Sequence, residues 1–354
     1  MTSLLLSRRT LLSTTLAAGT AGAMIFPRGI GHADVPPSRS DNAHQSQRDP
    51  LGSNMASRIV VPFAAGGTAD ILARVVADIL SARMGTPFVV ENRAEAGGAF
   101  SSEIVARAAP DGRTLLMGTL CTAVTNQYLQ KYLPYDSTES FAPVALVGEM
   151  ANVLVVHRNF PARTLKEFVD HCKRLGPHKV AYTSGGAGSA GHLAMEYLQN
   201  RAEFRVAHAA PGNHEGRRAR PLQELQAGRT MVAIDSLPTY LNHIGSGQLR
   251  ALCVTSATRC FVAPEIPTVA EQGFGAFDAT QWWYVAVPAG TRRDYVAALS
   301  EAIVSGLAQR SAVARIRGVG VQERPGTSED LFLHIAAENL KWKNVIASAG
   351  LVPQ

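Results

Sequence analysis

The sequence predicts an α/β protein with two domains. Apolar segments of strand length alternate with amphipathic segments of helical length, and this alternation occurs in two separate runs. Each run contains a glycine-rich turn that joins a strand to a helix. The chain has 354 residues, which is enough for two domains of ordinary size.

The N-terminus has the features of an export signal. In residues 1–33, the pair Arg8-Arg9 precedes an apolar stretch, and small residues precede a cleavage site near Ala33. The pair resembles a twin-arginine signal, which predicts a periplasmic protein. The alternative is an uncleaved membrane anchor, but the apolar stretch is short and diluted by Gly and Thr. Residues 34–57 are rich in Pro, Ser and Asn, which indicates a disordered linker.

Charge and cysteine content argue against several classes of protein. The formal net charge is +6, but the signal segment holds three arginines and no acid, so the mature chain would carry +3. That charge is too small to indicate a nucleic-acid partner, and no basic run is interleaved with aromatic residues. The cysteines show neither metal-ligand nor disulfide-framework spacing, so no metal or cofactor is predicted and the pairing of the thiols stays open. They are Cys121, Cys172, Cys253 and Cys260.

The first run of elements begins after the linker. Strands are expected at 58–63, 87–92 and 114–119, and helices at 71–84 and 101–109. In the first helix, apolar side chains recur every three or four residues and form one face. Strands that alternate with helices predict parallel pairing through right-handed crossovers.

The second run extends from residue 152 to 255. Strands are expected at 152–157, 179–184, 204–209, 230–236 and 249–255, and helices at 164–175, 192–200 and 222–228.

The chain then returns to the first domain. A strand is expected at 280–288, followed by a final helix at 328–349. Thr327 and Asp330 form a capping pattern before that helix, and Gly350 ends it. We therefore assign residues 58–154 and 280–354 to domain 1 and residues 155–279 to domain 2, with two hinge crossings and a ligand cleft between the domains.

The glycine-rich turn of the second run permits several interpretations. Gly186-Ala-Gly188-Ser-Ala-Gly191 matches the G-x-G-x-x-G dinucleotide fingerprint, but the strand at 204–209 does not end in the acid that a ribose requires. Ser189 lies in a near match to the nucleophile elbow of serine hydrolases. His192 is too close in sequence to be the distant histidine of that mechanism. A purely structural turn is a third possibility.

An anion site is the fourth interpretation of this turn. Glycines let backbone N–H groups converge, and the following helix contributes its positive N-terminal end. Ser184 and Ser189 add hydroxyl groups. The turn "PFAAGGTAD" in the first run is the same device, with Thr68 expected to cap the helix and Asp70 in its first turn. Two such turns across a cleft would hold a small carboxylate from both sides.

Longer stretches of the sequence resemble a known family. "IVVPFAAGGTADILARVVADIL", "APDGRTLLMGT", "AYTSGGAGSAGHLAMEYL" and "APEIPTVAEQGFGAFDATQWWYVAVPAGT" resemble the periplasmic solute receptors of tripartite tricarboxylate transporters, called Bug receptors. The resemblance covers nearly all of residues 58–352. It implies a type II-like periplasmic-binding-protein fold and a non-catalytic, monomeric receptor that delivers a small organic acid or amino acid to membrane permease subunits.

The resemblance also implies a set of ligand contacts. Asp235 matches an aspartate that meets the ammonium group of amino-acid ligands in relatives. Together with the two turns, the candidate ligand-binding residues are Phe63, Ala64, Gly66, Gly67, Thr68, Asp70, Ser184, Gly185, Gly186, Gly188, Ser189, His192 and Asp235.

One segment departs from the family pattern. After "FRVAHAAPG" the family usually has a short turn, whereas here "PGNHEGRRARPLQELQAG" is longer by several residues. The arginines of the stretch Arg217–Arg220 either belong to a solvated loop or reach the cleft.

Overall fold

The structure is a computed structural model that describes residues 56–94, 98–209, 213–214, 217–218 and 221–353. The expected export signal at 1–33, with Arg8 and Arg9, lies outside the described residues, as does nearly all of the expected linker. Within the described part of the chain, no helix is long and apolar enough to cross a membrane.

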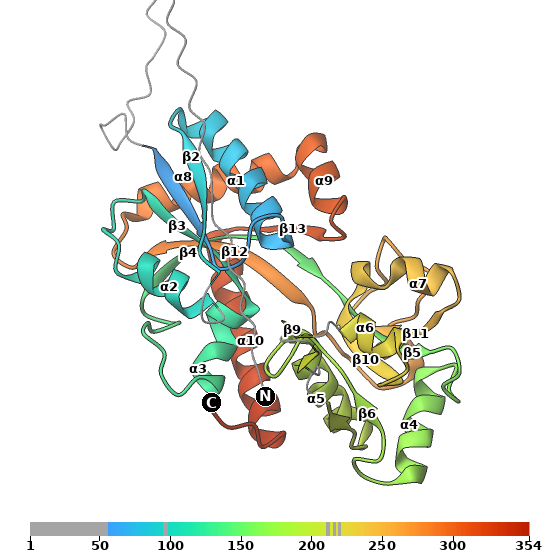
Figure 1. Cartoon of the computed structure of the whole chain (residues 1–354). Coiled ribbons are helices and arrows are strands. Elements are labelled where there is room, and N and C mark those ends of the chain that lie inside the picture. Colours follow the sequence, from blue (N-terminus) through green and yellow to red (C-terminus); the bar gives the residue numbers. More distant parts are fainter. Residues whose placement is uncertain (1–55, 95–97, 210–212, 215–216, 219–220, 354) are drawn as a thin grey trace, which may run out of the picture. The chain divides into compact units, whose positions relative to one another are not determined.

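The first domain is built on a six-stranded sheet with the strand order β13-β4-β12-β3-β1-β2 (Figure 1). The strands are β1 (Ser57–Val61), β2 (Phe88–Asn92), β3 (Thr114–Thr119), β4 (Phe141–Met150), β12 (Gln281–Pro288) and β13 (Gln322–Gly326). β1 pairs in parallel with both β2 and β3, as the alternation of strands and helices predicts. β12 and β13 pair antiparallel with their neighbours, so the sheet is mixed.

Helices cover both faces of this sheet, because successive strand residues alternate between two apolar clusters. Ile59 and Trp283 pack with α1 (Thr68–Met84), α8 (Arg293–Leu307) and α9 (Arg310–Arg317) on one face. Val60 and Trp282 belong to the cluster that includes α2 (Ala99–Ala106) and α10 (Ser328–Ser348) on the other face. The π-helical turn η2 (Cys121–Thr125) and α3 (Asn126–Leu129) follow β3. The sequence did not predict η2, α3, β4, α8, α9 or β13.

The final helix confirms its predicted start. Thr327 and Asp330 form a reciprocal capping box, in which each side chain accepts a hydrogen bond from the backbone N–H of the other residue. Gly350 adopts a φ of 65° just after the helix.

The second domain contains a three-stranded sheet with the order β10-β5-β11. Its strands are β5 (Asn152–His157), β10 (Val232–Ser236) and β11 (Leu249–Val254). Two further pairs of strands belong to this domain, namely β6 (Ala181–Tyr182) with β7 (Ala207–His208), and β8 (Asn213–His214) with β9 (Arg217–Arg218). The helices and 3-10 turns are α4 (Leu165–Leu175), α5 (Ala190–Ala202), α6 (Pro221–Gln226), η3 (Leu237–Thr239), α7 (Leu241–Gly245) and η4 (Ala270–Gln272).

The expectation of parallel pairing throughout is wrong in this sheet. β5 lies between β10 and β11 and is antiparallel to both. β10 and β11 therefore run in the same direction and are joined through α7, as a crossover requires, but β5 occupies the place between them. The alternation of strands and helices along the sequence predicts which strands run in the same direction. It does not reveal that another strand lies between them in the sheet.

The chain crosses between the two sheets at two places that are hydrogen-bonded to each other. It leaves the first sheet at Ala151, between β4 and β5, and returns just before β12. The buried Asn152 donates from Nδ2 to the carbonyl oxygen of Ala279 at 3.0 Å. Thr255 Oγ1 donates to the same carbonyl oxygen at 2.9 Å. The boundary expected between residues 154 and 155 falls within β5.

Candidate functional site

The first glycine-rich turn joins β1 to α1. Gly67 is the N-cap residue, with φ −81° and ψ 171°, and no side chain caps the helix. The expectation that Thr68 is the cap is therefore wrong, because the helix already begins at Thr68. The turn is stabilised by Asp70, whose Oδ2 accepts hydrogen bonds from the Gly66 N–H at 2.9 Å and from Arg74 Nε at 3.0 Å. Burial raises the pKa of Asp70, but these hydrogen bonds, a further one from Asn92 and the positive charge of Arg74 outweigh it and lower the pKa below its usual value.

The second glycine-rich turn joins β6 to α5. Ser189 is the N-cap residue, and its Oγ accepts a hydrogen bond from the His192 N–H at 3.3 Å. The same hydroxyl donates to Ser184 Oγ at 3.3 Å. Gly186 and Gly188 adopt φ values of 122° and 75°, which favour glycine. Both hydroxyls of this turn are thus used to hold its shape.

Two histidines, the buried His192 and the partly buried His208, support this second turn. His192 Nδ1 accepts the Gly188 N–H at 3.0 Å, and its ring stacks on that of His208 with centroids 4.2 Å apart. His208 Nε2 lies 2.9 Å from Ser184 Oγ. Burial lowers the pKa of His192 to about 4 and also lowers that of His208, so both rings are neutral at pH 7. His192 therefore positions the turn.

The two turns meet at a cavity of about 340 Å³. Its described lining consists of Phe63, Gly67, Thr68, Ala69, Thr119, Leu120, Cys121, Ser189, Ala190, Gln281, Trp282 and Trp283. The lining includes the first helical residues of α1 in one domain and of α5 in the other. No Lys, Arg, His, Asp or Glu is among these lining residues.

Backbone N–H groups at both helix starts are available to a ligand. In the described part of the chain, no hydrogen-bond partner is found for the N–H of Thr68, Ala69 or Ala190. The first N–H groups of a helix have no partner within the helix, and the aligned peptide dipoles place roughly half a unit of positive charge at that end. Two such ends, one from each domain, make the cavity suitable for an anion.

Four of the thirteen expected ligand-binding residues line the cavity: Phe63, Gly67, Thr68 and Ser189. Six others, namely Ala64, Gly66, Ser184, Gly185, Gly186 and Gly188, belong to the same turns, and Asp70 and His192 bond to them. Asp235 belongs to β10 and lies beside Gly185 of the second turn. The Oδ1 atom of Asp235 accepts a hydrogen bond from the Ser236 N–H at 2.8 Å. Burial raises the pKa of Asp235.

Sequence reasoning missed eight lining residues, namely Ala69, Thr119, Leu120, Cys121, Ala190, Gln281, Trp282 and Trp283. Those that follow β3 could have been found, because β3 is a parallel neighbour of β1 and both strands end at the same edge of the sheet. The residues of β12 could not, because their place depends on β12 pairing antiparallel with β3.

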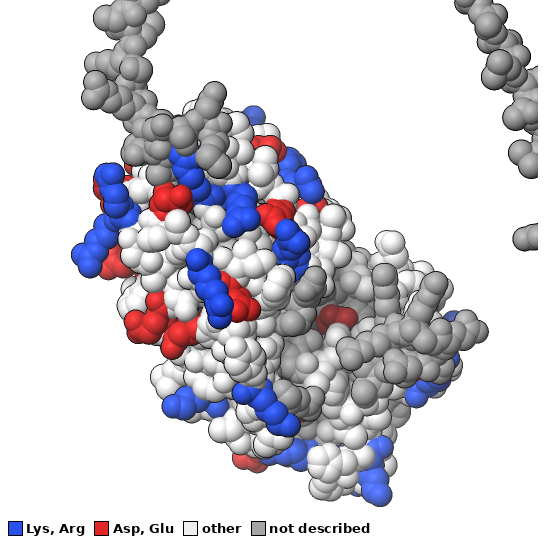
Figure 2. All heavy atoms as spheres, turned by 60° about the vertical axis from the view of Figure 1, so that its left-hand side comes forward, with Lys and Arg blue, Asp and Glu red and all other residues white. Residues whose placement is uncertain are grey.

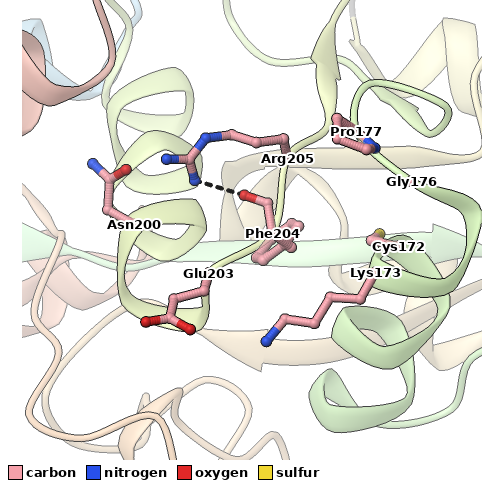
Figure 3. A pocket seen from close by; sticks show the side chains of 8 residues that line it. All are labelled: Cys172, Lys173, Gly176, Pro177, Asn200, Glu203, Phe204 and Arg205. Atoms are coloured by element: carbon pink, nitrogen blue, oxygen red, sulfur yellow. Dashed lines mark hydrogen bonds between the residues drawn. The ribbon is translucent and has the colours of Figure 1, made fainter.

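A larger hollow of about 430 Å³ lies at the other end of α5 (Figure 3). It is lined by residues that include Lys173, Glu203 and Arg205. Arg205 Nη1 donates to the carbonyl oxygens of Phe204 at 2.7 Å and Gln199 at 3.1 Å, so its guanidinium is engaged at the C-terminal end of the helix. α5 has 13 residues, which places this hollow about 20 Å from the glycine-rich turn. It is therefore separate from the candidate site.

Among the remaining predicted features, the cysteines are unpaired, and Cys121 also lines the cavity. Cys121, Cys172, Cys253 and Cys260 are free thiols. Within the described residues, no cluster of three or more His, Cys, Asp or Glu could hold a metal ion. On the face drawn in Figure 2, Lys and Arg lie among Asp and Glu. The side chains of the stretch Arg217–Arg220 lie outside the described residues.

The two-domain α/β fold, with a cavity between helix starts from both domains, defines a solute-binding protein. The family described as "Tripartite tricarboxylate transporter family receptor" matches residues 72–351, and the chain belongs to this family. Protein BugT of Bordetella pertussis is 32% identical over 294 residues, which cover 83% of this chain and 89% of BugT. A protein from the tcbD-tcbE intergenic region of Pseudomonas sp. strain P51 is 33% identical, with 81% and 84% covered.

Solved structures show the same fold. Rpa4515 of R. palustris, solved with adipate, is 30% identical, with a TM-score of 0.71 over 84% of this chain and 98% of that one. MatC of Rhodopseudomonas palustris, solved with bound malate, is 29% identical, with a TM-score of 0.67 over 82% and 98%. The expected family, fold class and receptor function are thereby confirmed.

Proposed function

We propose that this receptor captures a small carboxylate in the cavity between the N-terminal ends of α1 and α5, and delivers it to the permease subunits of a tripartite tricarboxylate-type transporter. The observation that carries the proposal is the pair of helix starts, one from each domain, whose N–H groups at Thr68, Ala69 and Ala190 lack partners in the described structure. Adipate and malate, the molecules named with Rpa4515 and MatC, support this choice of ligand chemistry.

The proposal includes a closing motion. A ligand held by α1 and α5 contacts both domains, which are joined by the two crossings at Ala151 and Ala279. Movement about two adjacent crossings is the usual hinge of binding proteins. Closure would bring the two helix ends onto opposite sides of the carboxylate and exclude water from it.

Proline substitution at the first helical position tests the role of the backbone directly. Thr68→Pro and Ala190→Pro each remove one N–H group, while the first position of a helix tolerates proline. The preceding residues, Gly67 and Ser189, already have the extended conformation that proline requires before it. Loss of one charge-assisted hydrogen bond costs about 1.5–3 kcal/mol, so each variant should bind adipate or malate roughly 10- to 150-fold more weakly in calorimetric titration.

Two kinds of control separate this effect from others. Thr68→Val and Ala190→Ser keep the N–H group and should each lower affinity by much less than the matched proline variant. Arg293→Pro, at the first position of α8 and away from the cavity, should leave affinity unchanged. If the proline variants fold and bind both anions as tightly as the parent, the backbone is not the anion site.

We further propose that the receptor is not a catalyst. In the described structure, Ser189 Oγ bonds to the His192 N–H and to Ser184 Oγ, and no imidazole nitrogen bonds to it. His192 Nδ1 already accepts from Gly188, so it does not act as the base for Ser189. A screen of chromogenic esters with the parent and Ser189→Ala should show the same background rate for both, whereas hydrolysis lost in Ser189→Ala would contradict the proposal.

Export to the periplasm and a monomeric state are also proposed. If the pair Arg8-Arg9 is a twin-arginine signal, replacing both residues with lysine should leave unprocessed precursor in the cytoplasm. Fractionation and N-terminal sequencing should locate the mature end close to Ala33. Unchanged processing of the double variant would contradict the twin-arginine assignment.

A further inference from the structure

The lining of the cavity restricts which small carboxylates the receptor can bind. This inference rests on the proposed function. The first restriction concerns charge. No basic side chain is among the described lining residues, so the positive charge that these residues bring to the cavity comes from the two helix ends. These supply roughly one unit together, which compensates one carboxylate well, two partly and three poorly. The carboxyl group of Asp235, beside Gly185, adds no attraction.

The second restriction concerns hydrogen bonds to hydroxyl groups. Ser189 Oγ is engaged with His192 and Ser184, and the Gln281 amide donates to Ser236 Oγ at 3.4 Å. The lining hydroxyls left without a partner in the described structure are those of Thr68 and Thr119. Thr119 is only 8% exposed and its Oγ1 is buried, so this hydroxyl does not face the open space of the cavity. Among the described lining side chains, the Thr68 hydroxyl and the remaining N–H and Oε1 of the Gln281 amide are left for a ligand. They can therefore serve one or two polar substituents of a ligand, but not four.

The third restriction concerns the walls. Phe63, Leu120, Trp282 and Trp283 contribute to the lining. The indole N–H of Trp282 donates to Glu338 Oε2 at 3.1 Å, so it is not available to a ligand. Leu120, Trp282 and Trp283 are 5% exposed or less, and Phe63 is 37% exposed. Apolar walls stabilise the apolar body of a ligand and leave a ligand's hydroxyl groups unpaired.

We infer that the receptor selects mono- or dicarboxylates with an apolar body, and that it discriminates against polyhydroxylated acids and tricarboxylates. The carboxylate lies at the helix ends of α1 and α5, the carbon body lies against Phe63 and Leu120, and the Thr68 hydroxyl serves a single polar substituent. The family is named for tricarboxylates, whereas the described lining of this cavity includes no cationic side chain that could pair with a third carboxylate.

Three acids with six carbon atoms test the inference. Adipate has two carboxylates and an apolar chain, galactarate has the same chain with four hydroxyl groups, and tricarballylate has a third carboxylate. In calorimetric titration of the mature receptor at pH 7, adipate should bind at least roughly tenfold more tightly than either of the others, because each unpaired buried polar group costs about that factor or more.

The outcomes separate the two proposals. Galactarate or tricarballylate binding as tightly as adipate, or within tenfold of it, overturns the inference about ligand class and leaves the carboxylate receptor standing. If none of these three acids and neither malate nor benzoate binds the folded receptor, the proposed function itself fails, and the inference fails with it.

A substitution in the cavity wall tests whether the wall determines the preference for adipate over galactarate. Phe63→Gln should reduce the ratio of adipate to galactarate affinity at least threefold, because the apolar wall becomes polar. Phe63 is partly exposed, so this change does not threaten the core. Phe100→Gln is the matched control, since Phe100 is 40% exposed and lies in α2, outside the lining. An unchanged ratio in Phe63→Gln, or an equal change in Phe100→Gln, overturns the role of the wall.

Discussion

Replacing Gly191 with alanine should destabilise the receptor, although alanine is normally the better residue in a helix. A Cβ atom at Gly191 would lie 2.3 Å from the carbonyl oxygen of Ile234 and 3.0 Å from its carbonyl carbon. Both atoms are backbone atoms of β10, so a change of side-chain rotamer cannot relieve the clash. Ordinary contact begins near 3.4 Å, and α5 must therefore withdraw from β10 by roughly 1 Å.

The magnitude follows from two opposed terms. Overpacking of a rigid contact costs about 1–3 kcal/mol, while exchange of glycine for alanine in a helix returns at most about 1 kcal/mol. We expect the free energy of unfolding to fall by about 1–2 kcal/mol. Because Gly191 is adjacent to Ala190, the same displacement moves the α5 end of the cavity, and adipate affinity should fall roughly tenfold.

Urea denaturation followed by tryptophan fluorescence and circular dichroism measures the first quantity, and calorimetric titration measures the second. Gly245→Ala is the matched control, because a Cβ atom at this last residue of α7 meets no atom within 4 Å. The control should be as stable as the parent or slightly more stable, with unchanged affinity. If Gly191→Ala behaves like Gly245→Ala, the close approach of α5 to β10 does not determine the geometry of the site.

Three further predictions concern pH, capping and closure. The pKa of His192 is about 4 in the folded state against 6.5 in the unfolded state, so the unfolded state binds the proton first as pH falls. The free energy of unfolding should therefore fall by roughly 3 kcal/mol between pH 6.5 and 4, and His192→Phe should flatten this slope in urea titrations at several pH values. Thr327→Ala removes the capping box of α10 and should lower the free energy of unfolding by about 1 kcal/mol, whereas an unchanged urea midpoint would show that the cap is dispensable. Small-angle scattering should give a smaller radius of gyration with saturating adipate than without it, and identical curves would argue against closure about Ala151 and Ala279.

The sequence alone determined those features that depend on neighbouring residues. The capping box at Thr327 follows from spacing, and the two glycine-rich turns follow from glycines placed between an apolar strand and a helix. A positive φ, as at Gly186 and Gly188, is a local requirement that glycine meets more easily than other residues, so the residue type itself indicates it. For the same reason, short motifs such as the two glycine-rich turns carry the resemblance to the family.

Only the tertiary structure decided which residues surround the ligand cavity. Gln281 is distant in sequence from the turns, and it reaches the cavity because β12 pairs antiparallel with β3, the neighbour of β1. The local interpretation of Thr68 as a cap was wrong, because Gly67 is the N-cap residue and Thr68 is already helical, while Asp70 stabilises the turn through the Gly66 N–H. Strand order and the packing of α5 at Gly191 depend on contacts between segments that are distant in sequence. The spacing of residues along the chain does not indicate which strand will pair with which, or which strand α5 will pack against.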